Sequence, residues 1–223
     1  MKSGSRSKPL LVPDSLAYAL TRAAEVVANV IDDRPRGSSR AGSPKGAATG
    51  RNLDASLAAC WHAHAQTLTP GQRGAVQDLA YGTLRQYGRG DFMLGRLLRT
   101  ALQDGDDTPG KLQLRALLLV ALYRLETRPS DAHTIVDQAV NAAGEIDHGR
   151  FKSLVNAVLR NRLRRDTELR AAANADPVAH YQHPLWWIEQ IRRGYPDCWA
   201  DILANGNVHD LGSFSQYADD DNG

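Results

Sequence analysis

The stretch KLQLRALLLVALYRL, residues 111–125, decides the fold of this chain. Its uninterrupted apolar run, Ala116–Tyr123, is far shorter than the roughly 20 residues that a membrane-spanning helix needs. Leucine and alanine favour helix, and Pro129 ends the segment. Because a helix that is apolar on most of its sides must be covered by other elements, this segment is expected at the centre of a helical bundle.

Further helices are predicted on both sides of this central segment. Asp14 or Ser15 can cap a first helix that reaches Ile31, and Thr69-Pro70 opens another that continues to about Gly88. The remaining helices are expected at about Leu53–Gln66, Phe92–Leu102, Ala132–Ala143, Arg150–Arg165, Trp186–Gly194 and Cys198–Ala204. Since no segment shows the alternation of a strand, the predicted fold class is all-α, a helical bundle with a C-terminal helical appendage.

Three segments have little to bury and are predicted to lie outside the packed core. Residues 1–13 are polar and basic and are expected to form a flexible arm. Residues 32–52 are rich in Gly, Ser, Pro and Ala, which predicts a mobile loop, and residues 208–223 are polar with a triple-Asp end, which predicts a disordered tail. The bundle is thus expected over 14–170 and the appendage over 171–207.

Composition narrows the class of protein further. The chain of 223 residues is long enough for one domain or slightly more. Cys60 and Cys198 lie far apart, which argues against a disulfide framework and favours a reducing compartment. On a helix only Cys60 and His64 of the Cys60-x-His62-x-His64 run share a face, so no metal site is predicted. No signal peptide or membrane span is evident, and we expect a cytoplasmic protein.

The net charge of +2 hides a strongly basic segment. Residues 149–170 contain seven Lys or Arg and only two Asp or Glu, and acidic residues near the C-terminus mask this excess. An anionic partner meets local clusters of charge rather than the total. Binding of nucleic acid is therefore one interpretation of this segment, and a solvated helix face is the other.

Within this basic segment, polar residues recur every four positions on one side of the predicted helix. Val155, Val158 and Leu159, with Phe151 and Leu154, are expected to face the core. The opposite side presents Lys152, Asn156, Arg160 and Arg164 at about 6 Å spacing, which matches the spacing of phosphates along a nucleic-acid strand. Arg162 falls on the apolar side, and we expect it where the helix leaves the core.

The helix after Pro70 shows a similar arrangement. Tyr81, Arg85 and Arg89 are four apart and lie away from the apolar side, so Tyr81 can stack on an unpaired base and Arg85 is a candidate to stack on a base or bind a nucleic-acid phosphate. The alternative is structural: Tyr81 packs between helices, and Arg85 pairs with a carboxylate such as that of Asp78.

These two helices resemble a known family. DLAYGTLRQ (Asp78–Gln86) and KSLVNAVLRNRL (Lys152–Leu163) are similar to the paired signatures of the NusB-like RNA-binding domain, and LLLVALYRL (Leu117–Leu125) and PSDAHTIVDQAVNAA (Pro129–Ala143) fit the same pattern. HPLWWIEQIRRGYPDCWADILANGN (His183–Asn207) resembles the linker subdomain that follows this domain in Sun/Fmu/RsmB-type ribosomal RNA cytosine-C5 methyltransferases. The resemblance covers about residues 14–207.

The resemblance implies a NusB-like helical domain that holds ribosomal RNA, 16S RNA in this family, followed by a helical linker subdomain. In the family, catalysis belongs to a following domain that binds S-adenosylmethionine. This sequence has no glycine-rich loop after a strand and no Pro-Cys or Thr-Cys nucleophile, so we expect no cofactor, no catalytic residue and no enzyme. Because the chain departs from the family pattern after about Asn207, truncation before the methyltransferase domain is expected.

Two other functions remain open at the level of sequence. A NusB-type transcription antitermination factor would bind a leader RNA together with a ribosomal-protein partner, although such factors normally lack the extension His183–Asn207. A helical protein-interaction scaffold would bind no RNA. The resemblance also implies that the surface with Trp186 and Trp187 faces a further domain, so an exposed apolar surface and a protein partner are expected there. The oligomeric state stays open.

Overall fold

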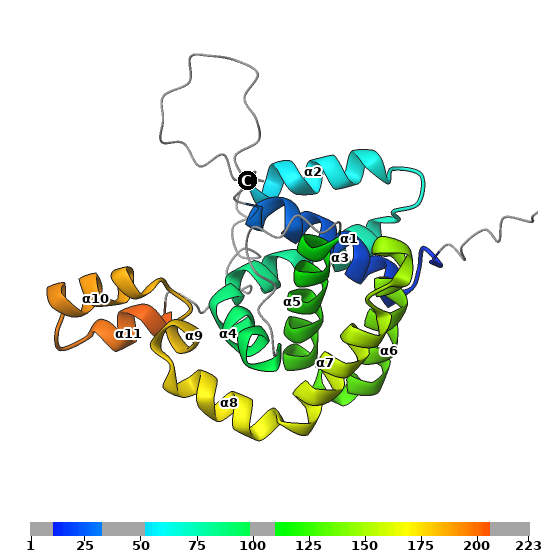
Figure 1. The fold of residues 1–223 in the computed structure, drawn as a ribbon. Helices are drawn as coiled ribbons and strands as arrows, with labels where there is room; N and C mark the ends of the chain where they lie inside the picture. The colour runs from blue at the N-terminus through cyan, green and yellow to red at the C-terminus, as the bar shows by residue number, and fades with distance from the viewer. Residues whose placement is uncertain (1–10, 33–51, 99–109, 206–223) are drawn as a thin grey trace, which may run out of the picture.

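The computed structural model describes residues 11–32, 52–98 and 110–205. This part of the chain forms eleven α-helices and three short 3-10 helices and contains no strand (Figure 1). The all-α prediction is confirmed. The predicted arm, loop and tail lie outside the described ranges, apart from a few residues at their edges. No helix in the described ranges is both long and apolar enough to cross a membrane.

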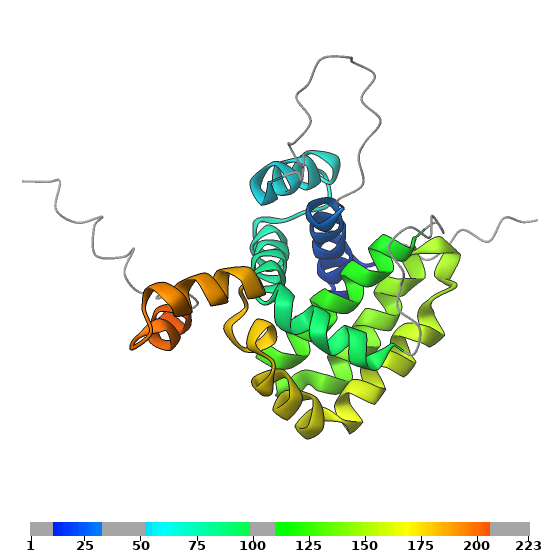
Figure 2. The same cartoon turned by 60° about the vertical axis from the view of Figure 1, so that its left-hand side comes forward.

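Helix α5 (Lys111–Thr127) is the central helix, as predicted from its apolar sequence. Around it lie α1 (Leu16–Ile31), α3 (Pro70–Arg85), α4 (Tyr87–Leu97), α6 (Ala132–Ala142) and α7 (Lys152–Arg164) (Figures 1 and 2). Its side chains from Ala116 to Leu122 are all at most 1% exposed. Because burial of one leucine contributes about 1.5–3 kcal/mol, this helix carries much of the core's stability.

The predicted caps set where the N-terminal helices begin. The Ser15 hydroxyl accepts a hydrogen bond from the Tyr18 amide at 3.2 Å at the start of α1. The Thr69 hydroxyl accepts from the Gln72 amide at 3.3 Å, and Pro70 occupies the first turn of α3. Between them, α2 (Leu53–Ala63) is capped by the Asn52 side chain. These hydrogen bonds satisfy amide groups that a helix leaves unpaired at its start.

Two glycines allow elements to approach closely next to α5. Gly110, which precedes the helix, has a φ of 83°, and a Cβ there would lie 2.9 Å from Cγ2 of Ile146. Gly82 of α3 lies against the ring of Tyr123, because a Cβ would be 2.0 Å from its Cζ. A side chain at either position would require its neighbours to move.

Helix α4 differs from its prediction of Phe92–Leu102 because it begins at Tyr87. Glycine is a poor helix former, which predicts a break near Gly88 and Gly90, yet both lie inside the helix. A Cβ at Gly88 would lie 3.1 Å from the Val178 carbonyl oxygen, and one at Gly90 would lie 3.2 Å from Leu119. These glycines therefore permit close helix packing rather than ending the helix.

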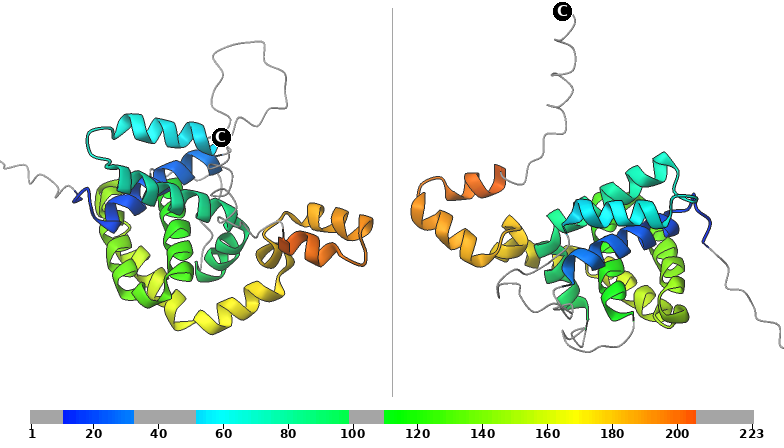
Figure 3. Two further views of the ribbon diagram at one scale, coloured as in Figure 1. Left: turned by 180° about the vertical axis from the view of Figure 1, so that it is seen from behind. Right: turned by 90° about the horizontal axis from the view of Figure 1, so that it is seen from above.

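Helix α8 (Asp166–Ala175) was not predicted, since only Leu169 and Ala173 of its residues are buried and the apolar signal is weak. It leads to α9 (Pro177–Tyr181), which was not predicted either, and then to α10 (Leu185–Gly194) and α11 (Trp199–Asn205), which match the two predicted C-terminal helices closely. Helices α10 and α11 contact each other, α10 contacts α9, and the pair projects from the bundle (Figure 3).

Helix α10 leaves large apolar side chains in solvent. Trp186 is 66% exposed, Leu185 50% and Trp187 39%, and Ile188 is the buried residue of this helix. The expected exposed apolar surface is therefore present. That a protein partner covers it stays a prediction, as do the domain boundaries at 170 and 207.

Candidate nucleic-acid interface

Helix α7 presents one side to the core and the other to solvent. A tight turn with positive φ at Asp147, His148 and Gly149 precedes it and sets its direction. Val155, Val158 and Leu159 are buried, as predicted, whereas Leu154 is 37% exposed and does not belong to the core side. The predicted stripe, Lys152 to Arg164, therefore lies on the side away from the core.

A groove between α6 and α7 collects the whole predicted stripe. It has a volume of about 530 Å³, and Lys152, Asn156, Arg160 and Arg164 all line it. Asn156 and Arg160 are joined by a hydrogen bond of 2.9 Å from Nε to Oδ1. From α6 the lining residues are His133, Val136, Asp137 and Val140, and α7 adds Ser153 and Leu163. The stripe is thus one wall of a concave surface.

The cations of this wall have no carboxylate partner among the residues that the structure describes. Lys152, Arg160 and Arg164 make no ion pair with any residue of the described ranges. By contrast, Arg165 pairs with Glu168 at 2.7 Å and Arg150 pairs with Asp147 at 3.6 Å. Because the neighbouring arginines are neutralised, the available positive charge of α7 is concentrated in the groove.

Arg162 departs from its prediction, because it is buried in the core rather than placed where the helix leaves it. Arg162 is only 1% exposed, and its guanidinium donates a hydrogen bond to the Asp166 carboxylate of α8. Partial burial alone would raise the pKa of Asp166, but hydrogen bonds from Arg162 and Arg170 outweigh it and lower that pKa. Arg162 therefore joins α7 to α8 and is not an RNA contact.

The second predicted stripe does not form a shared surface. The Tyr81 hydroxyl donates to Asp54 of α2 at 2.6 Å, and this hydrogen bond raises the pKa of Tyr81. Arg89 belongs to α4 and is held by Glu126 at 2.8 Å and by Asn174 at 2.9 Å. Arg85 is outside the groove and forms no ion pair with Asp78, so the structure does not bring it together with the other four predicted residues.

The α6 wall of the groove was not predicted. His133 and Asp137 are exposed, lie four residues apart and line the groove opposite the cations. The signal was present in the sequence, since residues at this spacing share one side of a helix. The spacing alone does not tell which neighbouring element this side of α6 faces. Only the packing of α6 against α7 shows that it borders the basic stripe.

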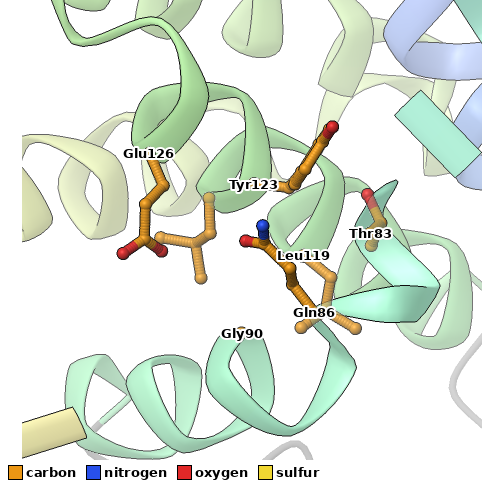
Figure 4. Close-up of a pocket in the computed structure, with 7 residues that line it drawn as sticks. Thr83, Gln86, Gly90, Leu119, Tyr123 and Glu126 are labelled. Carbon is orange, nitrogen blue, oxygen red and sulfur yellow. The ribbon is translucent and has the colours of Figure 1, made fainter. Parts of the chain in front are cut away.

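A second hollow, between α3, α4 and α5, is too small for a ligand. The residues that line it are Thr83, Gln86, Gly90, Leu119, Leu122, Tyr123 and Glu126 (Figure 4). Its volume is about 10 Å³, which is close to the space that one water molecule requires. We therefore regard it as a packing defect.

The predicted pairing of Cys60 with His64 on one helix face is seen, and Glu25 of α1 completes a cluster whose ligand atoms lie within 4.8 Å of one another. The Arg22 guanidinium occupies this cluster, 2.6 Å from His64 Nε2 and 3.0 Å from Glu25 Oε1. Burial and, to a lesser extent, the Glu25 charge raise the pKa of Cys60 to about 11. Since Arg22 already supplies the positive charge and the thiol stays protonated, we assign no metal here.

Comparisons with known proteins identify the family to which this sequence is similar. Residues 38–164 match the NusB family. Ribosomal RNA small subunit methyltransferase B of Pseudomonas putida is 36% identical over 137 residues, which are 61% of this chain and 30% of that protein. A probable methyltransferase of the same name from Coxiella burnetii is 34% identical over 133 residues, 60% of this chain and 30% of its own length.

The same enzyme of Vibrio cholerae is 31% identical over 157 residues, which are 70% of this chain and 35% of that protein. The aligned part thus spans about a third of the length of the relatives that it matches.

Proposed function

Because this chain belongs to the NusB family, we propose that it binds ribosomal RNA and that the α6–α7 groove is the contact surface. The residues that we assign to this surface are Lys152, Asn156, Arg160 and Arg164, with Arg85 as a separate RNA contact on α3. The proposal for Arg85 rests only on its place at the end of α3 and on the absence of an ion-pair partner for it in the described part of the chain.

The observation that carries this proposal is the row of cations on α7 that make no ion pair within residues 11–32, 52–98 and 110–205. Residues four apart on a helix rise by about 6 Å, which is within side-chain reach of successive phosphates on one strand. Lys152, Arg160 and Arg164 can each bind a phosphate without first breaking an ion pair to any described residue. Asn156, which accepts from Arg160, holds that guanidinium along the groove.

We further propose that this chain corresponds to the N-terminal part of a 16S ribosomal RNA cytosine-C5 methyltransferase. The names of the relatives, ribosomal RNA small subunit methyltransferase B, support this assignment. The role of the described residues is to hold RNA and not to perform the transfer. A thiol with a pKa of about 11, as at Cys60, is protonated at neutral pH and does not serve as a nucleophile. This role would place the protein in the cytoplasm.

The names of the relatives favour this function over that of an antitermination factor. Those relatives are methyltransferases, and no feature of the described residues points to a leader RNA or to a ribosomal-protein partner. A scaffold without an RNA ligand leaves the unpaired basic wall without a role.

A site-directed crosslinking experiment tests the proposed groove. The variant S153C places a cysteine at an exposed position in the groove, and a benzophenone is attached to it. The full chain also carries C198S, which removes the exposed cysteine at position 198. We expect the benzophenone to crosslink to 16S ribosomal RNA at about 50 mM salt and less at about 300 mM, because phosphate contacts weaken with salt.

The matched control carries the same label at Q77C, an exposed position on α3 that does not line the groove. Equal crosslinking from both positions, or none from S153C, would contradict the assignment of the groove.

A further inference from the structure

The groove between α6 and α7 has walls of opposite charge. Asp137 of α6 lines the same groove as Lys152, Arg160 and Arg164, yet forms no ion pair with any of them. A carboxylate on one wall and cations on the other leave a gap that suits a ligand with an anionic end and a hydrogen-bond-donating end. We propose that the groove selects a guanine in bound RNA through Asp137, an inference that rests on the RNA-binding function proposed above.

The carboxylate of Asp137 is held in place by its own helix. Its Oδ2 accepts hydrogen bonds from the side-chain amides of Gln138 at 3.1 Å and Asn141 at 3.2 Å. Gln138 is anchored in turn, because its Oε1 accepts from the Ala17 amide of α1 at 3.2 Å. Oδ1 accepts no hydrogen bond within the described part of the chain. The group is therefore oriented and retains acceptor capacity toward the groove.

The floor of the groove is apolar and its size suits a nucleotide. Val136 is 5% exposed, and Val140 and Leu163 are half-buried beside it. The volume of about 530 Å³ falls within the range of pockets that hold small ligands, roughly 300–1,000 Å³. A base can thus lie on the valine and leucine side chains while its phosphates meet the cations of α7.

The chemistry of a carboxylate distinguishes the four bases. It accepts hydrogen bonds only and repels phosphate, so at this position it favours a base edge over the backbone. Guanine presents two adjacent donors, N1–H and the N2 amino group, which can both donate to Oδ1, the carboxylate oxygen that accepts no hydrogen bond within the described part of the chain. Adenine, cytosine and uracil each place an acceptor beside their donor. Asp137 therefore matches guanine better than any other base.

The test compares short RNAs that differ at one position. The probes are fluorescein-labelled 12-nucleotide uridine RNAs with a central uridine, guanine, adenine, cytosine or inosine, titrated with the full chain in an anisotropy assay. We expect the guanine probe to bind about 10-fold more tightly than the uridine probe. Inosine lacks the N2 amino group and is expected to fall between the two.

The variant D137N is expected to lower the affinity for the guanine probe toward that for the uridine probe, because an amide offers one acceptor and one donor in place of two acceptors. We expect its affinities for the guanine and uridine probes to agree within about 2-fold. The matched control D131N removes a carboxylate just before the same helix but outside the groove, and it should keep the preference of the parent chain.

Equal binding of all probes by the parent chain, or a guanine preference that survives D137N, would overturn this inference while leaving RNA binding intact. If no probe and no ribosomal RNA binds at low salt, the proposed function fails with it. Unfolding curves of D137N that match the parent chain would show that the change acts on recognition and not on folding.

Discussion

The variant D166A is expected to lower the free energy of unfolding by about 2 kcal/mol, less than the loss of a fully buried ion pair because the Asp166 side chain is itself 43% exposed. Its carboxylate is the ion-pair partner of Arg162, whose side chain is 2% exposed. Loss of Asp166 leaves a buried guanidinium without a counter-charge, which is far more costly than loss of an exposed ion pair. Urea unfolding followed by far-UV circular dichroism measures the change.

Two further variants separate this effect from a general loss of charge. E168A removes an exposed carboxylate two residues away that pairs with Arg165, and it should cost much less than D166A because this ion pair is screened by solvent. R162M/D166A replaces the buried charge with an apolar side chain of similar length and should recover most of the lost stability. A double variant no more stable than D166A, or an E168A variant as unstable as D166A, would refute the role of this pair.

The same pair makes stability depend on pH in a defined direction. The pKa of Asp166 is lowered in the folded chain from an ordinary value of 3.8. Its contribution is thus complete above that value and is lost as pH falls through the lower folded pKa. We therefore expect the difference between the parent chain and D166A to be constant from pH 7 to 5 and to shrink below about pH 4.

The double charge reversal R160E/R164E is expected to weaken binding of ribosomal RNA about 10-fold at about 100 mM salt without unfolding the domain. Both side chains are exposed on the groove wall, and neither pairs with a described carboxylate, so their replacement removes no internal interaction beyond the Arg160–Asn156 hydrogen bond. Reversal adds repulsion of phosphate to the loss of attraction. Filter binding at several salt concentrations measures the effect.

A matched pair of reversals controls for the net charge of the chain. R73E/R128E changes the total by the same amount at exposed positions of α3 and at the end of α5, outside the groove. We expect it to weaken RNA binding by no more than about 2-fold, because charges beyond a Debye length are screened. A similar weakening of RNA binding by the two double variants would mean that the groove has no special role.

The helices were predictable from the sequence where the apolar pattern and a capping residue indicate the same helix. The apolar run of α5 and the capping residues Ser15 and Thr69 predict helices that the structure contains. The predictions fail at Gly88, Gly90 and α8, where tertiary packing decides. A glycine inside a helix looks like a break until the neighbouring helix that requires it is known.

The residues of the site that lie on one helix were predictable from the sequence, whereas the contacts between helices were not. Four residues at a spacing of four predict the basic wall of α7. Arg162 was misplaced, because a sequence does not show that a buried arginine has its partner four residues further along, in the next helix. Asp137 has no sequence signal that distinguishes it from any other exposed acid, since its role depends on α6 lying beside α7.

The central claim is that the cations of the α6–α7 groove bind phosphates. The salt dependence of RNA binding tests this claim most directly. The slope of log affinity against log salt becomes shallower by about 0.7 for each phosphate of a single strand that the protein no longer neutralises. For K152Q/R160Q/R164Q, measured against the parent chain with one unstructured RNA, we predict a slope shallower by about 2. An unchanged slope together with unchanged affinity would contradict the claim.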